Sequence, residues 1–268
     1  MNADWRNRYE AALEAAQQAG LFALQYFDRG VAVEWKSDDS PVTMADRGAE
    51  ALLRRALLEK FPADGFLGEE FGATPGSSGF RWIIDPIDGT RSFVRGIPIW
   101  ACMVGLEHKG ELIAGVVSLP ALKQVYRALR GDGAYRDERR IHVSAVATLD
   151  KAHVYYSSIA WFTKVGHETQ FLNLVNLTER QRGFGDFYGF VMVAQGSGEI
   201  MVEHGVHAWD LGALVPIVEE AGGKLTAWDG KLDIEKPDVV ASNGLLHEQA
   251  LRIMNGVPGK HSRTSSER

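Results

Sequence analysis

Hydrophobic positions in the first sixty residues follow helical spacing, with one polar interruption. Apolar and small residues recur every three or four positions from Trp5 to Phe27, which predicts an amphipathic first helix. Residues 34–41 are polar and charged, which is typical of a strand edge and a loop. Thr43 and Asp46 then have the spacing of a capping box, so we expect a second helix that begins there and runs to about Lys60.

The middle of the chain changes to strand-like runs. Trp82–Ile84 predicts a short buried strand, which we expect Pro86 to end and Gly89 to follow with a tight turn. Further strand-like runs follow at 100–107, 112–119, 124–129 and 134–135. Residues typical of hairpin turns separate them at 108–111 and 130–133. These runs predict consecutive antiparallel strands of one sheet.

The second half mixes both periodicities. We expect strands at 153–157, 199–203 and 223–228, a buried segment at 187–195, and helices near 167–177, 209–221 and 245–254. Gly222 and Gly223 supply an end signal for the helix at 209–221. A charged stretch at 137–140 divides the chain into subdomains 1–140 and 141–256, and the polar tail 257–268 is expected to be disordered.

Composition narrows the class of protein. The chain has 268 residues and a net charge of −6, so nothing in it suggests a nucleic-acid partner or an anionic membrane surface. The single cysteine, Cys102, lies in an apolar run and is expected to be a core residue. No apolar run approaches the roughly 20 residues of a membrane span, and no leader pattern opens the chain. We expect a cytoplasmic protein.

Acidic residues stand at the ends of predicted elements. Glu69 and Glu70 follow one apolar run, Asp85 and Asp88 follow another, and Asp210 opens a helix. Each has an ordinary alternative, since residues 85–89 form a typical turn sequence and an acid at a helix start caps it. Together they could meet, and carboxylates at buried strand ends need neutralisation. Oxygen ligands favour Mg²⁺, Mn²⁺ or Ca²⁺, whereas EF-hand spacing is missing and zinc is disfavoured.

Three segments in this order resemble the inositol monophosphatase superfamily: Gly68-Glu69-Glu70, then Asp85-Pro86-Ile87-Asp88-Gly89-Thr90, then Trp209-Asp210 with residues 219–223. The resemblance extends from the first helix to about residue 255. It implies an α+β fold, the layered α-β-α-β-α sandwich of the inositol monophosphatase and fructose-1,6-bisphosphatase type. It also implies a Mg²⁺-dependent phosphomonoesterase, commonly a homodimer, with its site between the two halves.

The resemblance also assigns metal ligands by position. It implies that Glu69, Asp85 and the Ile87 carbonyl hold a first Mg²⁺, and that Asp85, Asp88 and Asp210 hold a second. Two or three ions are expected, with Mn²⁺ as a possible substitute.

Other motif positions acquire supporting roles from the same resemblance. Glu70 would orient the site or hold a weaker third ion. Lys36 and Asp46 match a mobile loop that closes over the metals, although Lys36 could equally be a solvated loop lysine and Asp46 a helix cap. Glu69 and the Thr90 hydroxyl would orient the attacking water, while the backbone N–H groups of Gly89 and Thr90 would bind phosphate oxygens. Asp88 shares the catalytic role through its metal.

The substrate is expected to be a small phosphate ester. Residues 182–190 contain Gly-Asp-x-Tyr, which resembles the histidinol-phosphate phosphatase branch, and Asp186 with Glu203 could bind an ammonium group. Asp186 could instead be a turn residue, and Glu203 also matches a position that contacts inositol hydroxyls. Arg91 and Phe187 depart from the family pattern. L-histidinol phosphate is thus the leading substrate, and inositol 1-phosphate or a sugar phosphate is the second. A silent binding protein is a third hypothesis, while a nucleotide 3′-phosphatase lacks a basic cluster.

Overall fold

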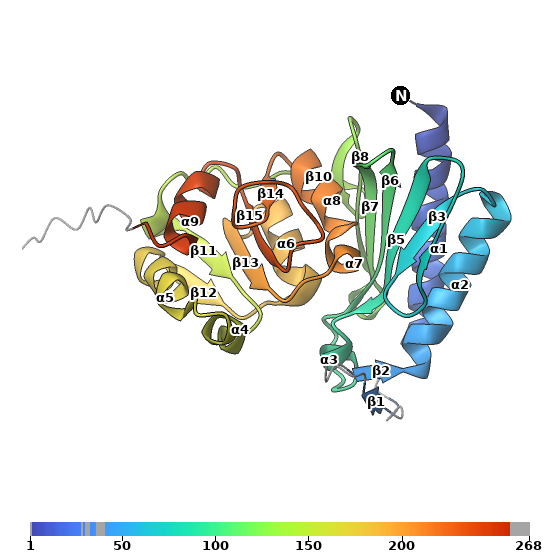
Figure 1. The fold of residues 1–268 in the computed structure, drawn as a ribbon, viewed down its shortest axis with the longest axis horizontal. Helices are drawn as coiled ribbons and strands as arrows, with labels where there is room; N and C mark the ends of the chain where they lie inside the picture. Colours follow the sequence, from blue (N-terminus) through green and yellow to red (C-terminus); the bar gives the residue numbers. More distant parts are fainter. Residues whose placement is uncertain (1, 28, 30–32, 36–40, 258–268) are drawn as a thin grey trace, which may run out of the picture.

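Two β-sheets and three helical layers alternate through the molecule (Figure 1). The computed structural model describes residues 2–27, 29, 33–35 and 41–257. The long helices α1 (Ala3–Leu24) and α2 (Met44–Lys60) cover one face of the larger sheet. Helices α6 (Asp186–Ala194) and α8 (Leu214–Glu220) lie between the sheets, and α5 (Glu168–Leu177) and α9 (His247–Met254) cover the outer face of the smaller sheet. The expected α-β-α-β-α sandwich is confirmed.

The larger sheet has eight strands in the order β10-β9-β8-β7-β6-β5-β3-β4. Neighbouring strands in this sheet are antiparallel, except that β3 and β5 run parallel to each other. Its strands are β3 (Gly65–Gly68), β4 (Gly72–Thr74), β5 (Phe80–Asp88), β6 (Ala101–His108), β7 (Glu111–Leu119), β8 (Gln124–Leu129), β9 (Gly133–Arg136) and β10 (Arg139–Ile141). The predicted run of consecutive antiparallel strands after residue 100 is therefore confirmed.

The smaller sheet has five strands in the order β12-β11-β13-β15-β14. Strand β11 (His153–Tyr155) runs parallel to β12 (Arg180–Arg182) and to β13 (Ile200–His204), whereas β15 (Asp238–Ser242) and β14 (Lys224–Thr226) complete it antiparallel. A separate hairpin pairs β1 (Val33–Trp35) with β2 (Pro41–Thr43). In the described part of the chain the remaining short α-helices are α3 (Thr90–Phe93), α4 (Ile159–Lys164) and α7 (Ala208–Leu211), and single 3₁₀ turns lie at Pro120–Leu122 and Leu149–Lys151.

The second helix begins where the sequence predicted. The Thr43 hydroxyl accepts a hydrogen bond from the Ala45 N–H at 3.1 Å, and the Asp46 carboxylate accepts from the Thr43 N–H at 2.7 Å. These reciprocal bonds satisfy N–H groups that the first turn of a helix leaves without partners. The helix then runs to Lys60, so both predicted bounds are confirmed.

The prediction that Pro86 ends the central strand is wrong. Strand β5 continues through Pro86 to Asp88, and its pairing with β6 shifts register between Asp85 and Asp88. The proline lacks an N–H to donate, and it stands at this irregularity, beyond the last pair with β3 at Ile84. The irregularity brings both aspartates to the same end of the sheet.

The single helix predicted over 209–221 is also wrong, because the chain forms two helices, α7 and α8. Pro216 has no N–H to donate to the carbonyl of Gly212, so a continuous helix would lose a bond there. The break lies against the larger sheet, where a Cβ on Gly115 would collide with the backbone of Ala213. This close approach fixes α7, and with it Asp210, against β5 and β6.

One apolar core joins the two sheets. It combines Met103 and Val117 from the larger sheet with Met201 and Ala241 from the smaller sheet and with Val191 of α6. The charged residues 137–140 lie at the β9–β10 hairpin. The chain leaves the larger sheet after Ile141.

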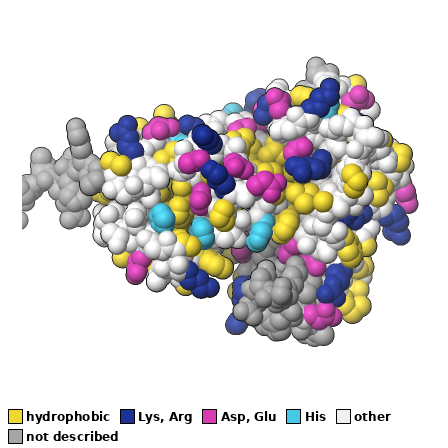
Figure 2. All heavy atoms as spheres, in the orientation of Figure 1, with side chains coloured by type: hydrophobic (Ala, Val, Ile, Leu, Met, Phe, Trp, Pro, Cys, Tyr) yellow, Lys and Arg dark blue, Asp and Glu magenta, His cyan; other side chains and the backbone are white. Residues whose placement is uncertain are grey.

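Acidic and basic side chains are interspersed over the face seen in Figure 2. Among the described residues, no helix combines the length and the apolar character that a membrane crossing requires. The tail expected to be disordered lies outside the described residues from 258 onward, and so does Lys36.

Candidate active site

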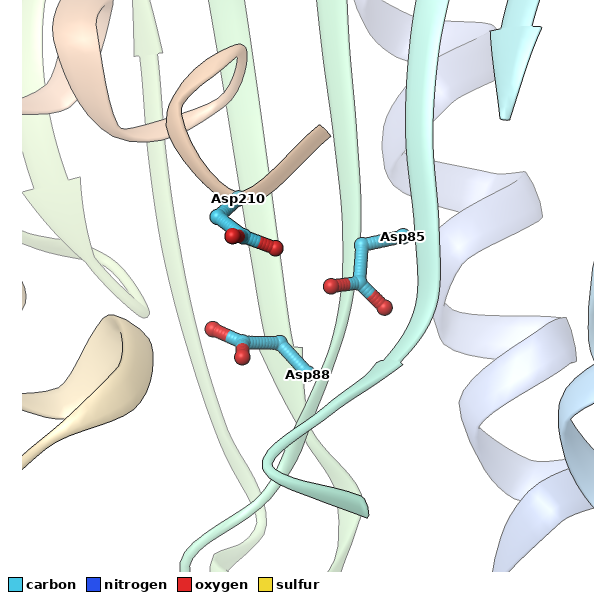
Figure 3. Close-up of side chains that lie close together, drawn as sticks. All are labelled: Asp85, Asp88 and Asp210. Atoms are coloured by element: carbon cyan, nitrogen blue, oxygen red, sulfur yellow. The ribbon is translucent and has the colours of Figure 1, made fainter. Parts of the chain in front are cut away.

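Three aspartates converge between the larger sheet and the middle helical layer. Asp85 and Asp88 come from the end of β5 and Asp210 from α7, and Figure 3 shows their carboxylates directed toward one another. One carboxylate oxygen from each lies within 4.8 Å of the others. Asp85 and Asp88 are buried, at 2% and 8% exposure. Residues 125 positions apart in the chain therefore form one acidic cluster.

Backbone N–H groups fix the orientation of each aspartate. The Ile87 N–H donates to Asp85 Oδ1 at 3.0 Å, and the Phe187 N–H at the start of α6 donates to Asp88 Oδ2 at 2.7 Å. Asp210 accepts from the His207 N–H at 2.7 Å, which closes the first turn of α7. The capping alternative for Asp210 is thus correct, and the same carboxylate also faces the cluster. Capping and clustering do not compete.

Glu69 joins this cluster from the neighbouring strand. Gly68 pairs with Ile84 where β3 runs parallel to β5, and the Glu69 N–H donates to the Ile84 carbonyl at 3.3 Å. Glu69 therefore stands beside Asp85, and its charge is one of the causes that raise the pKa of Asp85. Glu70 lies at the next position of the turn toward β4, and its charge adds to the burial that raises the pKa of Asp46.

The electrostatics of the cluster indicate that it needs a cation. Burial raises the pKa of Asp85 well above its ordinary value, and the charges of Glu69, Asp88 and Asp210 add to the effect. Burial likewise raises the pKa of Asp88 well above its ordinary value, and the charges of Asp186 and Asp210 add to that rise. Among the described residues no Lys or Arg forms an ion pair with Asp85 or Asp88. A hard divalent cation would neutralise these carboxylates, and an all-oxygen donor set suits Mg²⁺.

Thr90 and Asp46 form a polar connection beside the cluster. The Thr90 hydroxyl donates to the Ile87 carbonyl at 3.0 Å and lies 3.4 Å from Asp46 Oδ1. Asp46 also accepts from the Thr43 hydroxyl at 2.6 Å. Burial raises the pKa of Asp46 to about 6, and Thr43 opposes that rise. Asp46 thus both caps α2 and reaches the site.

A pocket opens from the cluster toward the smaller sheet. Its lining includes Asp88 and Asp210 of the cluster, together with Glu203, Ser157 and Trp161. The pocket occupies about 420 Å³ including its open mouth, which suits a small molecule. Asp186 and Glu203 line this pocket in addition to the cluster residues, so a ligand that combines a metal-bound anion with a cationic group would match it.

Asp186 forms part of the rim of this pocket. It is the first residue of α6 and has a φ of 53°, a left-handed conformation that a non-glycine residue adopts at a cost. The residue is exposed, yet partial desolvation by the surrounding protein, followed by the charge of Asp210, raises its pKa to about 6. Arg91 opposes that rise. Asp186 therefore begins a helix and is not the turn residue of the alternative interpretation, and it lines the pocket.

Glu203 lies deep in the pocket wall with one oxygen unsatisfied. Its Oε1 accepts from the Ser157 hydroxyl at 2.6 Å and from the His204 N–H at 3.2 Å. Its buried Oε2 has no hydrogen-bond partner among the described residues. Burial raises the pKa of Glu203 to about 8. A buried acceptor without a donor indicates a place where a ligand donor can bind.

The structure brings most of the expected site residues together. The residues around this one pocket and cluster are Asp46, Glu69, Asp85, Ile87, Asp88, Gly89, Thr90, Asp186, Glu203 and Asp210. Ser157 and Trp161, which line the pocket, were not found from the sequence, because they follow a short strand with no motif of their own.

Comparison with known proteins agrees with this geometry. The family model described as the inositol monophosphatase family matches residues 4–258. A histidinol-phosphatase of Mycobacterium tuberculosis is 42% identical over 83% of this chain and 88% of its own length. An inositol-1-monophosphatase of Mesorhizobium japonicum is 33% identical over 90% and 94%. The crystal structure of the extragenic suppressor protein SuhB of Bartonella henselae has a TM-score of 0.87 at 30% identity, over 92% of this chain and 98% of that one.

Fold and site together define a metal-dependent phosphatase of the layered α+β type. The chain belongs to the inositol monophosphatase family. It is accordingly a phosphoric monoester hydrolase that acts on small phosphate esters with the help of a metal.

Proposed function

We propose that the protein hydrolyses L-histidinol phosphate to L-histidinol and phosphate, with Mg²⁺ bound at the acidic cluster. The observation that supports this substrate is that two further acids, Asp186 and Glu203, line the same pocket as Asp88 and Asp210. An amino alcohol phosphate has a dianion for the metal and an ammonium group for these two acids, and the ammonium charge would favour the ionised form of Glu203. The similarity to relatives named histidinol-phosphatase supports the same assignment.

The metal ligands are proposed by position. One Mg²⁺ would be held by Glu69, Asp85 and the Ile87 carbonyl, and a second by Asp85, Asp88 and Asp210. Glu70 would orient the site or hold a third ion, and Mn²⁺ would substitute for Mg²⁺. Mg²⁺ held by these residues would supply positive charge to the phosphate dianion, to an acidified water and to the leaving alkoxide.

Thr90 and Glu69 would orient the attacking water. The Thr90 hydroxyl donates its proton toward Ile87 O and Asp46, so its lone pairs are left to accept a hydrogen bond. The Glu69 carboxylate would be the second acceptor, and it would take up the proton that the water loses. With both protons held, the oxygen of the water is directed at phosphorus for in-line attack.

Gly89 gives the phosphate a close approach to the backbone. It has a φ of 84°, and a Cβ there would lie 3.1 Å from the Ile99 carbonyl and 3.3 Å from Asp186 Oδ2. Both the conformation and the space thus favour glycine. The N–H groups of Gly89 and Thr90, at the start of α3, would bind phosphate oxygens.

Phosphate release from L-histidinol phosphate and from inositol 1-phosphate, each with and without Mg²⁺, tests the proposal. We expect Mg²⁺-dependent release with a strong preference for the histidinol ester. Asp186→Asn should raise KM for L-histidinol phosphate by about tenfold, since it removes a charge-assisted contact, and should change KM for an ester without an ammonium group much less. Equal effects on both esters would contradict the assignment of Asp186.

Inositol 1-phosphate, or a broader range of sugar phosphates, is the second candidate. The unsatisfied Oε2 of Glu203 could equally accept a hydroxyl group, and a relative named inositol-1-monophosphatase is 33% identical. Preference for the inositol ester would keep the metal chemistry and reject the ammonium site. No Mg²⁺-dependent release from any ester would indicate a binding protein of the same fold.

The setting follows from the same proposal. The single cysteine is buried and suits a reducing compartment such as the cytoplasm. We propose a homodimer, which size-exclusion chromatography with light scattering tests. We further propose that residues 1–140 and 141–256 are the two subdomains of the chain. Because one core spans both sheets, we expect the two subdomains to unfold together.

A further inference from the structure

Glu50 is a fully buried acid on α2, and both of its carboxylate oxygens accept hydrogen bonds. Oε2 accepts from the Glu70 N–H at 2.7 Å. Oε1 accepts from the Phe71 N–H at 3.1 Å and from Arg54 Nε at 2.8 Å. The two N–H groups belong to the turn between β3 and β4, directly after Glu69. A buried carboxylate on a helix therefore holds the backbone that follows a proposed metal ligand.

We propose that Glu50 is a positioning residue that fixes this turn so that Glu69 faces the metal site. On one flank, Glu69 is tied through its own N–H to the Ile84 carbonyl. Glu50 ties the other flank through the next two N–H groups. With both flanks held, the direction of the Glu69 side chain toward Asp85 is set before a cation arrives. The inference rests on the proposed role of Glu69 as a ligand.

The same helix also supports the other side of the site. Asp46 lies four residues before Glu50 on α2 and approaches the Thr90 hydroxyl. Residues four apart share one face of a helix, so this face of α2 contacts both chain segments that carry the proposed water-orienting groups. Outer hydrogen bonds of this kind commonly change metal affinity or activity by about 10- to 100-fold when removed.

A purely structural role for Glu50 is the competing explanation. Arg54, its ion-pair partner, also donates to the Gly72 carbonyl and to the Thr74 hydroxyl, so the pair joins α2 to β4. Asp64 offers a matched control at the opposite end of β3. It is also buried, and it accepts from Arg8 Nε at 2.8 Å and from the Ser78 hydroxyl at 2.7 Å.

The test compares Mg²⁺ affinity by calorimetry, without substrate, in the unmodified protein and in Glu50→Gln, Asp64→Asn and Glu69→Gln. The glutamine amide at 50 would turn an N–H₂ toward a backbone N–H, so the turn must move. We expect Glu50→Gln to weaken Mg²⁺ binding by about tenfold or more, and its kcat to recover at saturating Mg²⁺. Asp64→Asn should lower the melting temperature and leave Mg²⁺ affinity within twofold.

Glu50→Asp is the second variant, because it keeps the charge and withdraws the carboxylate by one methylene. It should weaken Mg²⁺ binding in the same direction, which separates geometry from charge. Mg²⁺ affinity within twofold of the unmodified protein in both Glu50 variants, or an equal loss in Asp64→Asn, overturns the inference. If Glu69→Gln binds Mg²⁺ as tightly as the unmodified protein, the proposed metal site itself is wrong. If only the Glu50 variants leave affinity unchanged, the positioning role alone fails.

Discussion

At pH 7 the ligand-free protein should be less stable with Glu203 than with glutamine at this position. Burial raises its pKa from 4.5 to about 8, while Ser157 and the His204 N–H oppose that rise through Oε1. Oε2 has no described partner. Between pH 4.5 and 8 the folded state therefore binds a proton that the unfolded state has released. Stability contributed by this group is present at low pH and is lost as pH rises through that window.

The size of the effect follows from the shift. Each pH unit above 4.5 lowers the free energy of unfolding by about 1.36 kcal/mol, so the proton that the folded state must bind at Glu203 costs about 3 kcal/mol at pH 7. At pH 5 the same arithmetic leaves roughly 1 kcal/mol. Glu203→Gln keeps the size of the side chain and an acceptor for Ser157, and it removes the titration. We therefore expect it to stabilise the metal-free protein at pH 7, with a gain that shrinks as pH falls to 5.

The assay is urea unfolding in EDTA at pH 5, 6 and 7, because bound metal would alter the charges of Asp186 and Asp210. Glu199→Gln is the matched control: Glu199 is also buried, and its two oxygens accept from the Ser144 hydroxyl at 2.7 Å and the His153 N–H at 2.6 Å. That substitution should destabilise the protein. A loss of stability in Glu203→Gln that is equal at all three pH values would refute the reasoning.

Three further perturbations follow from the same structure. Asp88→Asn should abolish turnover and the Mg²⁺-induced rise in melting temperature, yet raise the melting temperature in EDTA, because it removes one of several repelling carboxylates; full activity would reject the site. Gly115→Ala should lower the free energy of unfolding by about 2 kcal/mol through its collision with Ala213, and an unchanged urea midpoint would contradict that packing. Burial lowers the pKa of His247 from 6.5 to about 4, so the stability that neutral His247 contributes is complete above pH 6.5 and falls as the pH drops to 4. In urea unfolding, His247→Gln should reduce the pH dependence of stability between pH 6.5 and 4 by up to about 3 kcal/mol, whereas an unchanged slope would exclude His247 as its source.

Local sequence carried much of the fold. The capping box at Thr43 and Asp46 specified the start of α2, because its bonds join residues three apart. The hairpin turns after residue 100 specified antiparallel neighbours for the same reason. By contrast, β15 and the short helix α4 were missed, although Pro237 and Asn243-Gly244 flank β15 and Gly166 follows α4. The break between α7 and α8 depends on Pro216 and on contact with the larger sheet.

For the site, too, some features follow from the sequence and others only from the tertiary structure. The sequence by itself determined the chemical type, because three acidic motifs in order identify a family and an oxygen-ligand metal centre. Only the tertiary structure decided that Asp46 and Asp210 cap helices and face the site at once, and that the Phe187 N–H holds Asp88. It alone placed Glu50 behind Glu69. These arrangements join residues 20 to 125 positions apart, and the free energy that selects them comes from burial and hydrogen bonds between segments, which no local pattern records.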